Sequence, residues 1–590
     1  MRLLFALAAA SFAPPETRYQ IDLSQAASRT LTVTVDTSCR ASDCDFQLPV
    51  WNATYQVRDF AQYVTGFQAS DPAGRPLPSR LLTPSSWRVT ATPGARLRLR
   101  YRYLADGVSP FGCSASDRHV FLNFAQILLY PAGRLREPMS VGFLNVPAGW
   151  KTALELPEQE GLFHARHYDE LADAPAELSP FAEAHFTLAG KRLRVVVDAD
   201  PADYDLNRLK TTTEKIAAAA THIMQEAPFP SYTFFYHFRP GGGGGMEHAN
   251  STAIDARAPC RDCDLAGVTA HEFFHLWNVK RIRPASMEPI DYTREDITPS
   301  LWFAEGVTST YGSYILLAAG LETPKRFLER LQDQITRYES LAARLEQSAE
   351  EASIAAWMER YPGYRRPSRS VSYYLKGELI GYALDLTIRQ ASGNRRSLDD
   401  VMRRLNLDYA QKGRFFEDTT ALERLASEAA GRDLRDFFDR MVRRADPVDW
   451  NLYLGYAGYG VLPQVTTAPS LGLETGRAPG QALAVSELEP GGPADKAGLR
   501  SGDRLVSLNR RPVERNLAAA LEALNLEPGA SVSLEVERRG QTLSFTLKPA
   551  QVRRTSYRIE EIPNATAAQR GIASAWLRAK PSGRVTEPRP

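Results

Sequence analysis

The segment His271–His275 (HEFFH) has the residue types and the spacing needed to bind a metal and to use it in hydrolysis. Residues four apart on a helix share a face, so the imidazoles of His271 and His275 can reach one cation. Glu272 follows the first histidine and projects toward the open coordination position, where a water molecule would be deprotonated. The alternative is a pair of buried histidines satisfied by hydrogen bonds. The apolar surroundings, AGVTAHEFFHLWN, favour a metal.

A third protein ligand is expected elsewhere, because catalytic zinc sites usually have three protein ligands and one open position. The best candidate is Glu305 in the segment TPSLWFAEGVTSTYGSY, which reads as a second helix. A carboxylate among apolar neighbours such as Trp302 and Phe303 is costly unless it is paired. We therefore expect His271, His275 and Glu305 to bind one Zn²⁺ per chain.

This ligand set resembles that of the thermolysin-like metallopeptidases, which use two histidines and a glutamate. The resemblance implies a thermolysin-like catalytic domain with Glu272 as general base. In thermolysin an aspartate follows the glutamate ligand by four residues, whereas this chain has Ser309. The partner that orients Glu305 is therefore not predicted.

A glycine run, GGGGGMEHANSTAI, precedes the metal motif by about twenty residues. Taken alone, such a run is typical of a flexible linker. The segment GGMEH, however, resembles the Gly-Ala-Met-Glu-Asn motif of the aminopeptidase N family. The resemblance implies that Glu247 binds the α-amine of the substrate and that Gly244, Gly245 and Met246 line the substrate. Glycines suit that position because their backbone can lie directly against a peptide. The earlier glycines read as a mobile turn, and His248 has no predicted role.

The segment SYYLKGELIGY resembles a Tyr-Glu-Lys-Gly segment of the same family, with Tyr374, Lys376 and Gly377 matching. The resemblance implies that the Tyr374 hydroxyl stabilises the tetrahedral intermediate. Together with HEFFHLWNVKRIRP and a C-terminal PDZ domain, the motifs are most similar to the glycyl aminopeptidase family. That resemblance implies removal of a small N-terminal residue, Gly or Ala, from peptides.

Two other functions remain open at this point. A zinc endopeptidase would cleave N-acetylated peptides, and a catalytically idle scaffold would use only its PDZ domain to recruit peptide tails. Three cations after the metal motif, Lys280, Arg281 and Arg283, are explained by the preference for positive charge at a helix C-terminus. A contact with the far carboxylate of the substrate is the alternative.

The elements that must position these residues indicate a multidomain α+β protein. Short β-rich runs such as RLRLRYRYL fill residues 14–200 and predict a β-sandwich-like domain. The pattern changes after Tyr204, and residues 201–450 read as the mainly helical, thermolysin-like zinc peptidase domain.

Residues 456–549 resemble a PDZ domain, most specifically in the segment PADKAGLRSGDRLVSLN. The resemblance implies that backbone N–H groups around Leu471, Gly472 and Leu473 receive the C-terminal carboxylate of a protein or peptide. The alternative is a domain that only packs against its neighbour. Residues 550–590 remain as a C-terminal tail, in which ATAAQRGIASAWL is a candidate short helix.

Composition limits the partners and the compartment. With 71 Lys and Arg against 69 Asp and Glu, the chain carries almost no net charge, which argues against a nucleic-acid partner. The sequence has no uninterrupted run of about 18 apolar residues, so no membrane span is predicted. Residues 1–10 read as a signal peptide ending in an alanine cleavage site, which favours export to a periplasm or to the medium. Two close cysteine pairs, Cys39–Cys44 and Cys260–Cys263, suit disulfides there, although the second pair could also be half of a zinc knuckle. The oligomeric state is not predicted.

Overall fold

A computed structural model describes residues 17–52, 55–358, 370–476, 482–513, 516–527 and 529–578. The predicted signal peptide, residues 1–10, lies outside this range. The chain divides into two compact units. One contains residues up to 328, 341–459 and those from 562 onward, and the other contains residues 329–340 and 460–561.

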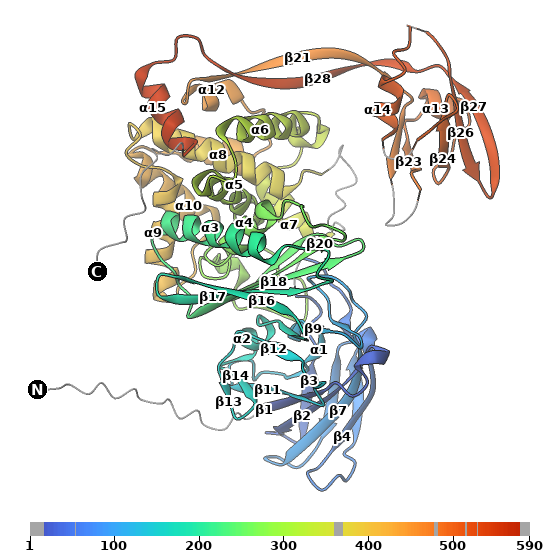
Figure 1. Cartoon of the computed structure of the whole chain (residues 1–590). Helices are drawn as coiled ribbons and strands as arrows, with labels where there is room; N and C mark the ends of the chain where they lie inside the picture. Colours follow the sequence, from blue (N-terminus) through green and yellow to red (C-terminus); the bar gives the residue numbers. More distant parts are fainter. Residues whose placement is uncertain are drawn as a thin grey trace, which may run out of the picture. The chain divides into compact units, whose positions relative to one another are not determined.

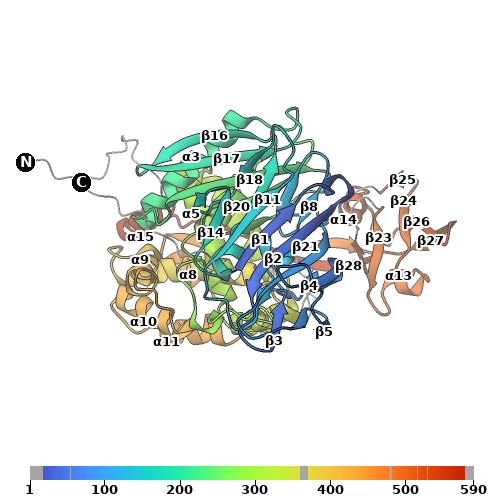
Figure 2. The ribbon, with the colours of Figure 1, turned by 90° about the horizontal axis from the view of Figure 1, so that it is seen from below.

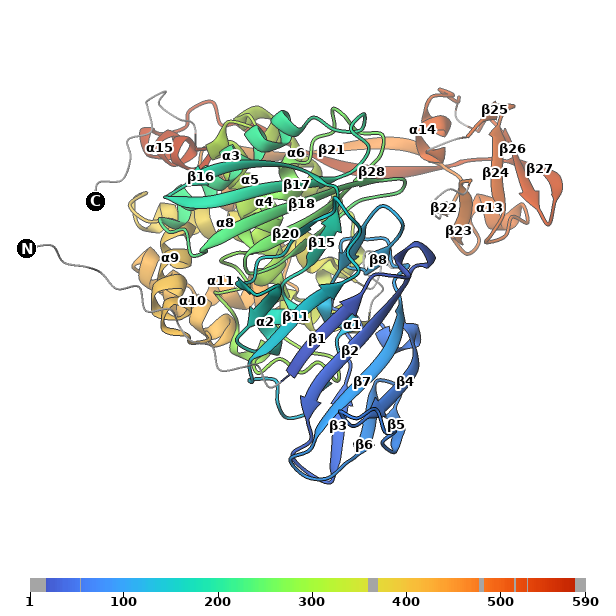
Figure 3. The same cartoon turned by 60° about the horizontal axis from the view of Figure 1, so that its bottom comes forward.

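The N-terminal part of the larger unit is built of β-sheets (Figure 3). Its main sheet has seven strands in the order β13-β14-β11-β1-β2-β7-β4. Strand β7 shows why the sheet forms, because leucines and tyrosines that are buried alternate with exposed arginines along it. The strands are β1 (Thr17–Asp22), β2 (Thr30–Ser38), β4 (Val64–Ser70), β7 (Arg96–Leu104), β11 (Met139–Leu144), β13 (Glu158–Gln159) and β14 (Leu162–Ala165).

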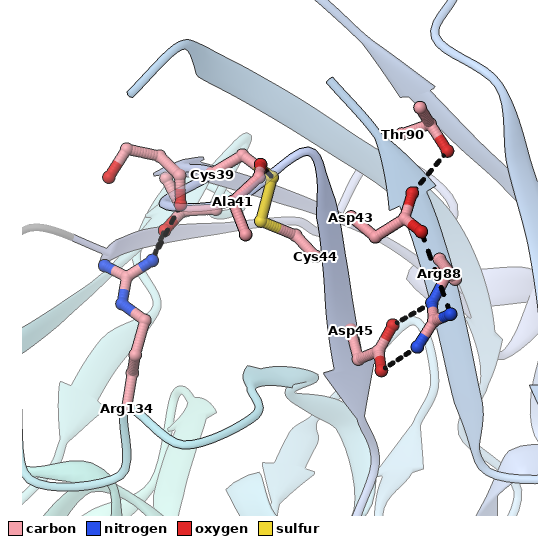
Figure 4. Close-up of a disulfide and its surroundings, with 10 residues drawn as sticks. Cys39, Ala41, Asp43, Cys44, Asp45, Arg88, Thr90 and Arg134 are labelled. Carbon is pink, nitrogen blue, oxygen red and sulfur yellow. Dashed lines mark hydrogen bonds and ion pairs between the residues drawn. A yellow bond between two sulfur atoms is a disulfide. The ribbon is translucent and has the colours of Figure 1, made fainter. Parts of the chain in front are cut away.

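Two four-stranded sheets complete this β domain, in the orders β10-β3-β6-β5 and β12-β15-β9-β8. Near the start of β3, Cys39 and Cys44 form a disulfide with Cα atoms 5.7 Å apart, and Arg88 binds Asp45 through two hydrogen bonds (Figure 4). The strands are β3 (Asp43–Gln47), β5 (Ser79–Thr83), β6 (Ser86–Thr90), β8 (Ser114–Ala115), β9 (Val120–Leu122), β10 (Tyr130–Pro131), β12 (Lys151–Ala153) and β15 (Ala176–Ser179).

The peptidase part begins with a five-stranded sheet in the order β16-β17-β18-β20-β19 (Figure 1). Strands β17 (Lys191–Asp198), β18 (Ser231–Arg239) and β20 (Ser251–Arg257) run parallel, and β16 (Ala182–Leu188) is antiparallel at one edge. At the other edge the short β19 (Gly245–Glu247) pairs antiparallel with β20. The last glycine of the run and the two residues after it therefore form an edge strand. Figure 2 shows strands β16, β17, β18 and β20 of this sheet from below.

Helices cover this sheet and form the rest of the peptidase part. Four of them carry or support the site: α3 (Leu206–Met224), α4 (Ala266–Phe274), α5 (Thr308–Ala319) with the π-helical segment η4 (Trp302–Val307) before it, and α8 (Tyr373–Ala391). The others include α7 (Ala349–Ile354), α9 (Leu398–Asp408), α10 (Asp418–Ala430), α11 (Arg435–Phe438) and α12 (Trp450–Gly455).

Part of the C-terminal tail is ordered as α15 (Ala567–Trp576), within the segment that reads as a short helix in the sequence. Its Trp576 is fully buried and donates its indole N–H to the hydroxyl of Tyr314 over 2.8 Å. Buried tryptophans usually find such a partner. The helix is therefore docked in the core of the larger unit.

The smaller unit contains the PDZ sheet, with β22 (Leu473–Gly476), β23 (Ala484–Leu488), β24 (Arg504–Leu508), β26 (Val532–Arg538) and β27 (Gln541–Leu547) in that order. Helix α14 (Leu517–Glu522) contributes two leucines to its apolar core. A two-stranded ribbon, β21 (Tyr459–Ser470) with β28 (Ala550–Glu561), flanks the domain in sequence. The expected multidomain α+β class is confirmed. Within the described residues, we find no helix with the length and apolarity of a membrane span.

Candidate active site

The three predicted metal ligands converge on one point between two helices. His271 and His275 come from α4 and the residue after it, and Glu305 comes from η4. The two Nε2 atoms lie 3.1 Å apart, and Glu305 Oε2 lies 3.4 Å from His271 Nε2 and 3.2 Å from His275 Nε2. A π-helical turn is rare and is often found at functional sites.

This donor set fits a zinc ion. In a tetrahedral site with metal–ligand distances of about 2.0–2.2 Å, neighbouring ligand atoms lie about 3.3–3.6 Å apart. The triangle formed by His271, His275 and Glu305 has edges of 3.1, 3.4 and 3.2 Å. Two imidazole nitrogens and one carboxylate oxygen are also the ligands that zinc prefers in hydrolases.

The two histidine ligands are oriented by hydrogen bonds at their Nδ1 atoms, on the side of each ring away from the metal position. His275 Nδ1 donates to the carbonyl of Asn278 over 2.6 Å, so in the neutral imidazole that binds a metal the lone pair is on Nε2. His271 Nδ1 lies 3.2 Å from Ser309 Oγ. Ser309 stands where thermolysin has an aspartate. Its hydroxyl donates to the backbone carbonyl of Glu305 over 3.0 Å, so its oxygen can accept a hydrogen bond from His271 Nδ1.

Glu305 is oriented by a residue of the N-terminal β domain that the sequence analysis missed. Tyr55 donates its hydroxyl hydrogen to Glu305 Oε1 over 2.8 Å, while Oε2 faces the histidines. The bond joins residues 250 positions apart in sequence. Tyr55 is buried, and its backbone has a φ of 49°, a conformation that non-glycine residues adopt rarely. Its ring packs edge-on against Trp357 and Tyr373.

Burial and neighbouring charges shift the pKa values of the two carboxyl groups of the site in opposite directions. Burial disfavours the charged form of Glu305, but the charge of His275 and hydrogen bonds from both imidazoles outweigh it and lower the pKa of Glu305. Burial raises the pKa of Glu272 well above its ordinary value. Glu305 is thus suited to remain an anionic ligand, whereas Glu272 binds a proton more readily than an ordinary glutamate does.

Glu272 and the glycine strand are in direct contact. A Cβ on Gly245 would stand 2.5 Å from Glu272 Cγ and Oε1, so any other residue at this position would displace the Glu272 side chain. Gly244 has a φ of +94°, which also favours glycine. Met246 is buried, and its carbonyl accepts a hydrogen bond from Thr252. The glycines therefore let β19 lie against the proposed base.

Glu247 lies beside the metal triad. One atom each of Glu247, Glu272 and His275 lies within 4.8 Å of the others. Tyr374 lies in the first turn of α8, and its ring centroid lies 6.1 Å from that of His271. Tyr373 is buried behind it, whereas Tyr374 is half-buried and lines the pocket.

One pocket of about 320 Å³ is lined by the metal ligands, Glu272, Glu247, Tyr374 and the last two glycines of the run. Met246, which was expected to line the substrate, is not among the residues that line this pocket, because its side chain is buried. The floor of the pocket carries the metal ligands with Glu272, and the N-terminal β domain contributes a wall. The residues that line it are Trp51, Asn52, Tyr55, Phe111, Gly244, Gly245, Glu247, Val268, His271, Glu272, His275, Val279, Lys280, Arg283, Met287, Glu305, Ser309 and Tyr374.

His248 and the three cations after the metal motif, whose roles the sequence leaves open, all bind other residues of the chain. His248 and Lys280 both bind Asp173, at 3.3 and 2.7 Å. Arg281 donates to two backbone carbonyls, and Arg283 pairs with Glu288 at 2.9 Å. Lys376, matched in the YLKG segment, donates to the carbonyl of Gln347. Burial lowers the pKa of Lys376 to about 8.

The second cysteine pair does not form a metal site with other cysteines. Cys260 and Cys263 are joined by a disulfide with Cα atoms 5.2 Å apart. Cys113 is the free cysteine and is buried. Another group that could hold a cation, His119, Glu177 and Asp198, lies outside the pocket.

In the PDZ domain, β22 is the edge strand of the sheet and begins at Leu473. Gly472 has a φ of +65°, and a Cβ there would stand 3.0 Å from Pro493 Cδ. Leu471 is buried in the domain core. An edge strand preceded by such a turn suits the addition of a peptide strand.

Comparison with protein families identifies the domains. The sequence matches the profile of the M61 glycyl aminopeptidase over residues 264–380 and that of the peptidase M61 N-terminal domain over residues 18–180. Residues 485–538 match a PDZ domain. The metal ligands and Tyr374 fall within the first match, whereas Tyr55 and Phe111 fall within the second.

A solved structure with a similar fold is an aminopeptidase N family protein from Idiomarina loihiensis. The TM-score is 0.84 at 25% identity, over 95% of this chain and 100% of that chain. An M1 zinc metallopeptidase from Deinococcus radiodurans matches with a TM-score of 0.48 at 16% identity, over 73% of this chain and 94% of that chain.

Among curated proteins, the regulator of sigma-E protease RseP of Escherichia coli (strain K12) is 36% identical over 80 residues. The match covers 14% of this chain and 17% of that protein. The chain therefore spans about a sixth of the length of this relative.

Proposed function

The chain belongs to the M61 glycyl aminopeptidase family, and from that premise we propose that it is a zinc aminopeptidase that removes a small first residue, Gly or Ala, from peptides. The finer parts of this proposal are the exopeptidase register, the small first residue and the roles of the individual side chains. Each is supported by the geometry of the pocket.

The observation that carries the register is the closeness of Glu247 to the metal triad. Its carboxylate lies within 4.8 Å of His275 and Glu272. In an amino acid, the α-nitrogen and the carbonyl carbon are two bonds apart, about 2.5 Å. A carbonyl at the metal would therefore bring the amine of the same residue within reach of Glu247.

The side chains then have distinct tasks. Zinc, when bound, supplies a Lewis acid that polarises the scissile carbonyl and acidifies the attacking water. Glu272 accepts the proton of that water and passes it to the leaving amine. Tyr374 donates a hydrogen bond to the carbonyl oxygen as it becomes an oxyanion. Glu247 binds the α-ammonium group and so selects free N-termini.

An endopeptidase would need an open path for the chain on the amine side of the metal. Glu247 occupies that side with a carboxylate, and its charge favours an ammonium group over a further peptide bond. An idle scaffold would have no reason to keep Glu272 buried beside three convergent ligands, because a buried carboxyl without a task is costly.

We also propose that the chain is exported to a periplasm or secreted. Disulfides persist mainly in oxidising compartments, and the chain has two of them. For the PDZ domain, we propose that the loop at Leu471–Leu473 and β22 bind the C-terminus of a peptide or protein.

The test is one panel of anilides of Gly, Ala and Leu and their N-acetyl forms, assayed on wild type and on Glu247→Ala. We expect kcat/KM for Gly-anilide to fall about 10²–10³-fold in Glu247→Ala, since a buried charge pair is worth roughly 2–5 kcal/mol when one partner is truncated. Acetylation should cost wild type a similar factor. Glu158→Ala, at an exposed position on β13, is the matched control and should keep wild-type activity. If wild type cleaves acetyl-Gly-anilide as readily as Gly-anilide, Glu247 is not an amine anchor and the aminopeptidase function is wrong.

A further inference from the structure

A loop of the N-terminal β domain lies against the glycine strand and narrows the pocket. The loop joins β7 to β8, and its Phe111 lines the same pocket as Glu247 and Tyr374. Two ring atoms of Phe111 lie 3.7 and 3.8 Å from the point where a Cβ on Gly244 would stand. The ring therefore faces Gly244, the residue before β19, across a gap that a single methyl group would fill.

Hydrogen bonds hold the tip of this loop in place. The carbonyl oxygens of residues 110–112 all accept from amide side chains. Asn123 donates to two of them, at 3.1 and 2.7 Å, and Asn52 donates to the carbonyl of Phe111 at 3.1 Å, as does Gln126. Asn123 and Gln126 are themselves buried. The turn also requires Gly112, because a Cβ there would stand 1.9 Å from a carbonyl oxygen.

The ring of Phe111 is covered on a second side as well. The guanidinium carbon of Arg58 lies 5.3 Å from the ring centroid, within the range of a cation–π contact. The ring lies between the Arg58 guanidinium and the backbone at Gly244, on a loop whose carbonyl oxygens accept hydrogen bonds. Moving the ring out of the pocket would therefore break favourable contacts. Phe111 is thus a fixed wall of the pocket.

This wall borders the pocket that would receive the first side chain of a substrate. The first residue is bound between Glu247 and the metal ligands, and its side chain shares the pocket of about 320 Å³ with that wall. Glycine or alanine needs little of this space, whereas a branched or aromatic side chain must displace a ring that is held in place.

We propose that Phe111 is the specificity-determining residue that limits the first residue of the substrate to glycine or alanine. This inference rests on the aminopeptidase function proposed above and names the side chain that sets its preference. It gives the N-terminal β domain a direct part in substrate selectivity.

The test compares the ratio of kcat/KM for Leu-anilide to that for Gly-anilide in wild type, Phe111→Ala and Phe111→Leu. Hydrophobic pockets discriminate by about 10–200-fold per methylene. We expect the Leu/Gly ratio to rise at least about 10-fold in Phe111→Ala, with a smaller rise in Phe111→Leu. Zinc content should stay at the wild-type level in both.

The matched control is Phe67→Ala, which truncates a half-buried phenylalanine of the same domain that stacks on Trp87 outside the pocket. Its Leu/Gly ratio should equal that of wild type. A zinc-loaded Phe111→Ala with an unchanged ratio overturns the inference, and if that variant does not fold, an unchanged ratio in Phe111→Leu does so. A wild type that cleaves Leu-anilide as well as Gly-anilide overturns it too. A wild type that accepts N-acetyl-Gly-anilide refutes the aminopeptidase function instead, so the two failures are distinguishable.

Discussion

Removing one hydroxyl group of the N-terminal β domain should weaken zinc binding in the peptidase domain. In Tyr55→Phe the ring keeps its contacts with Trp357 and Tyr373, but the hydrogen bond to Glu305 Oε1 is lost. Burial and the charges of Glu305 and Glu247 raise the pKa of Tyr55 well above its ordinary value, so the hydroxyl remains a donor at neutral pH. The substitution therefore removes one charge-assisted bond and little else.

The expected magnitude follows from the burial of that bond. A hydrogen bond to a charged group contributes about 1.5–3 kcal/mol, and each 1.4 kcal/mol corresponds to about tenfold in an equilibrium constant. Losing it should raise the Kd for zinc about 10–100-fold, which matches the usual effect of removing a residue that orients a metal ligand. Glu305 Oε1 is left buried without this donor, so the melting temperature of the zinc-free protein should fall as well.

The assay equilibrates wild type and variants with a competing chelator and measures bound zinc by mass spectrometry. The matched control is Tyr311→Phe, which removes a buried hydroxyl that donates to Asp399 over 3.0 Å, away from the metal. It should lower the melting temperature and leave the Kd for zinc unchanged. If Tyr55→Phe binds zinc with wild-type affinity, the hydroxyl does not orient Glu305 and the reasoning is refuted.

Three further predictions concern the groups around the metal. Glu272→Gln should retain zinc while kcat collapses, because it keeps the shape and removes the base; loss of zinc together with activity would contradict this role. Tyr374→Phe should lower kcat about 10²–10³-fold, whereas Tyr373→Phe should not, and the opposite result would identify the buried neighbour as the donor. Gly245→Ala should lower kcat without loss of zinc, since its Cβ must displace Glu272; single-turnover rates with normal chemistry would show that the strand can retreat.

The metal site could be predicted because its signals are local. The pair of histidines in HEFFH needs only the period of a helix, and α4 supplies it. Glu305 was indicated by the cost of burying a carboxylate among apolar residues. The structure brings all three ligand atoms to within 3.4 Å of one another.

The groups that orient these ligands could not be predicted. Tyr55 is one of 24 tyrosines and lies 250 residues from its partner, so neither its type nor its spacing marks it. Asp173, which binds both His248 and Lys280, is likewise distant in sequence from its partners and could not be predicted as their partner. Such long-range hydrogen bonds leave no periodic trace in the sequence.

The glycine run shows how context decides between two explanations of one pattern. As a linker it would need no partner, yet Gly245 pairs with Ile254 and Glu247 with Thr252 in the sheet. Two glycines of the run have neighbours too close for a side chain: a Cβ on Gly242 would stand 2.3 Å from the carbonyl oxygen of Ala256, and a Cβ on Gly245 would stand 2.5 Å from Glu272. Gly244 is favoured instead by its φ of +94°. The mobility of the earlier glycines stays a prediction.

Gly377 of the SYYLKGEL segment links the two helical segments that carry Glu305 and Tyr374. A Cβ on Gly306 would stand 2.4 Å from Gly377 Cα, and a Cβ on Gly377 would stand 2.1 Å from the carbonyl oxygen of Trp302. The backbones of η4 and α8 therefore touch. Gly306 follows the glutamate ligand directly, and Gly377 lies about one turn after the tyrosine. The close contact between the two glycines thus sets the distance between the metal ligand and the proposed oxyanion donor, because a methyl group at either position would push the two helical segments apart. The glycine of this motif is required by the geometry of the reaction centre, even though it touches neither metal nor substrate.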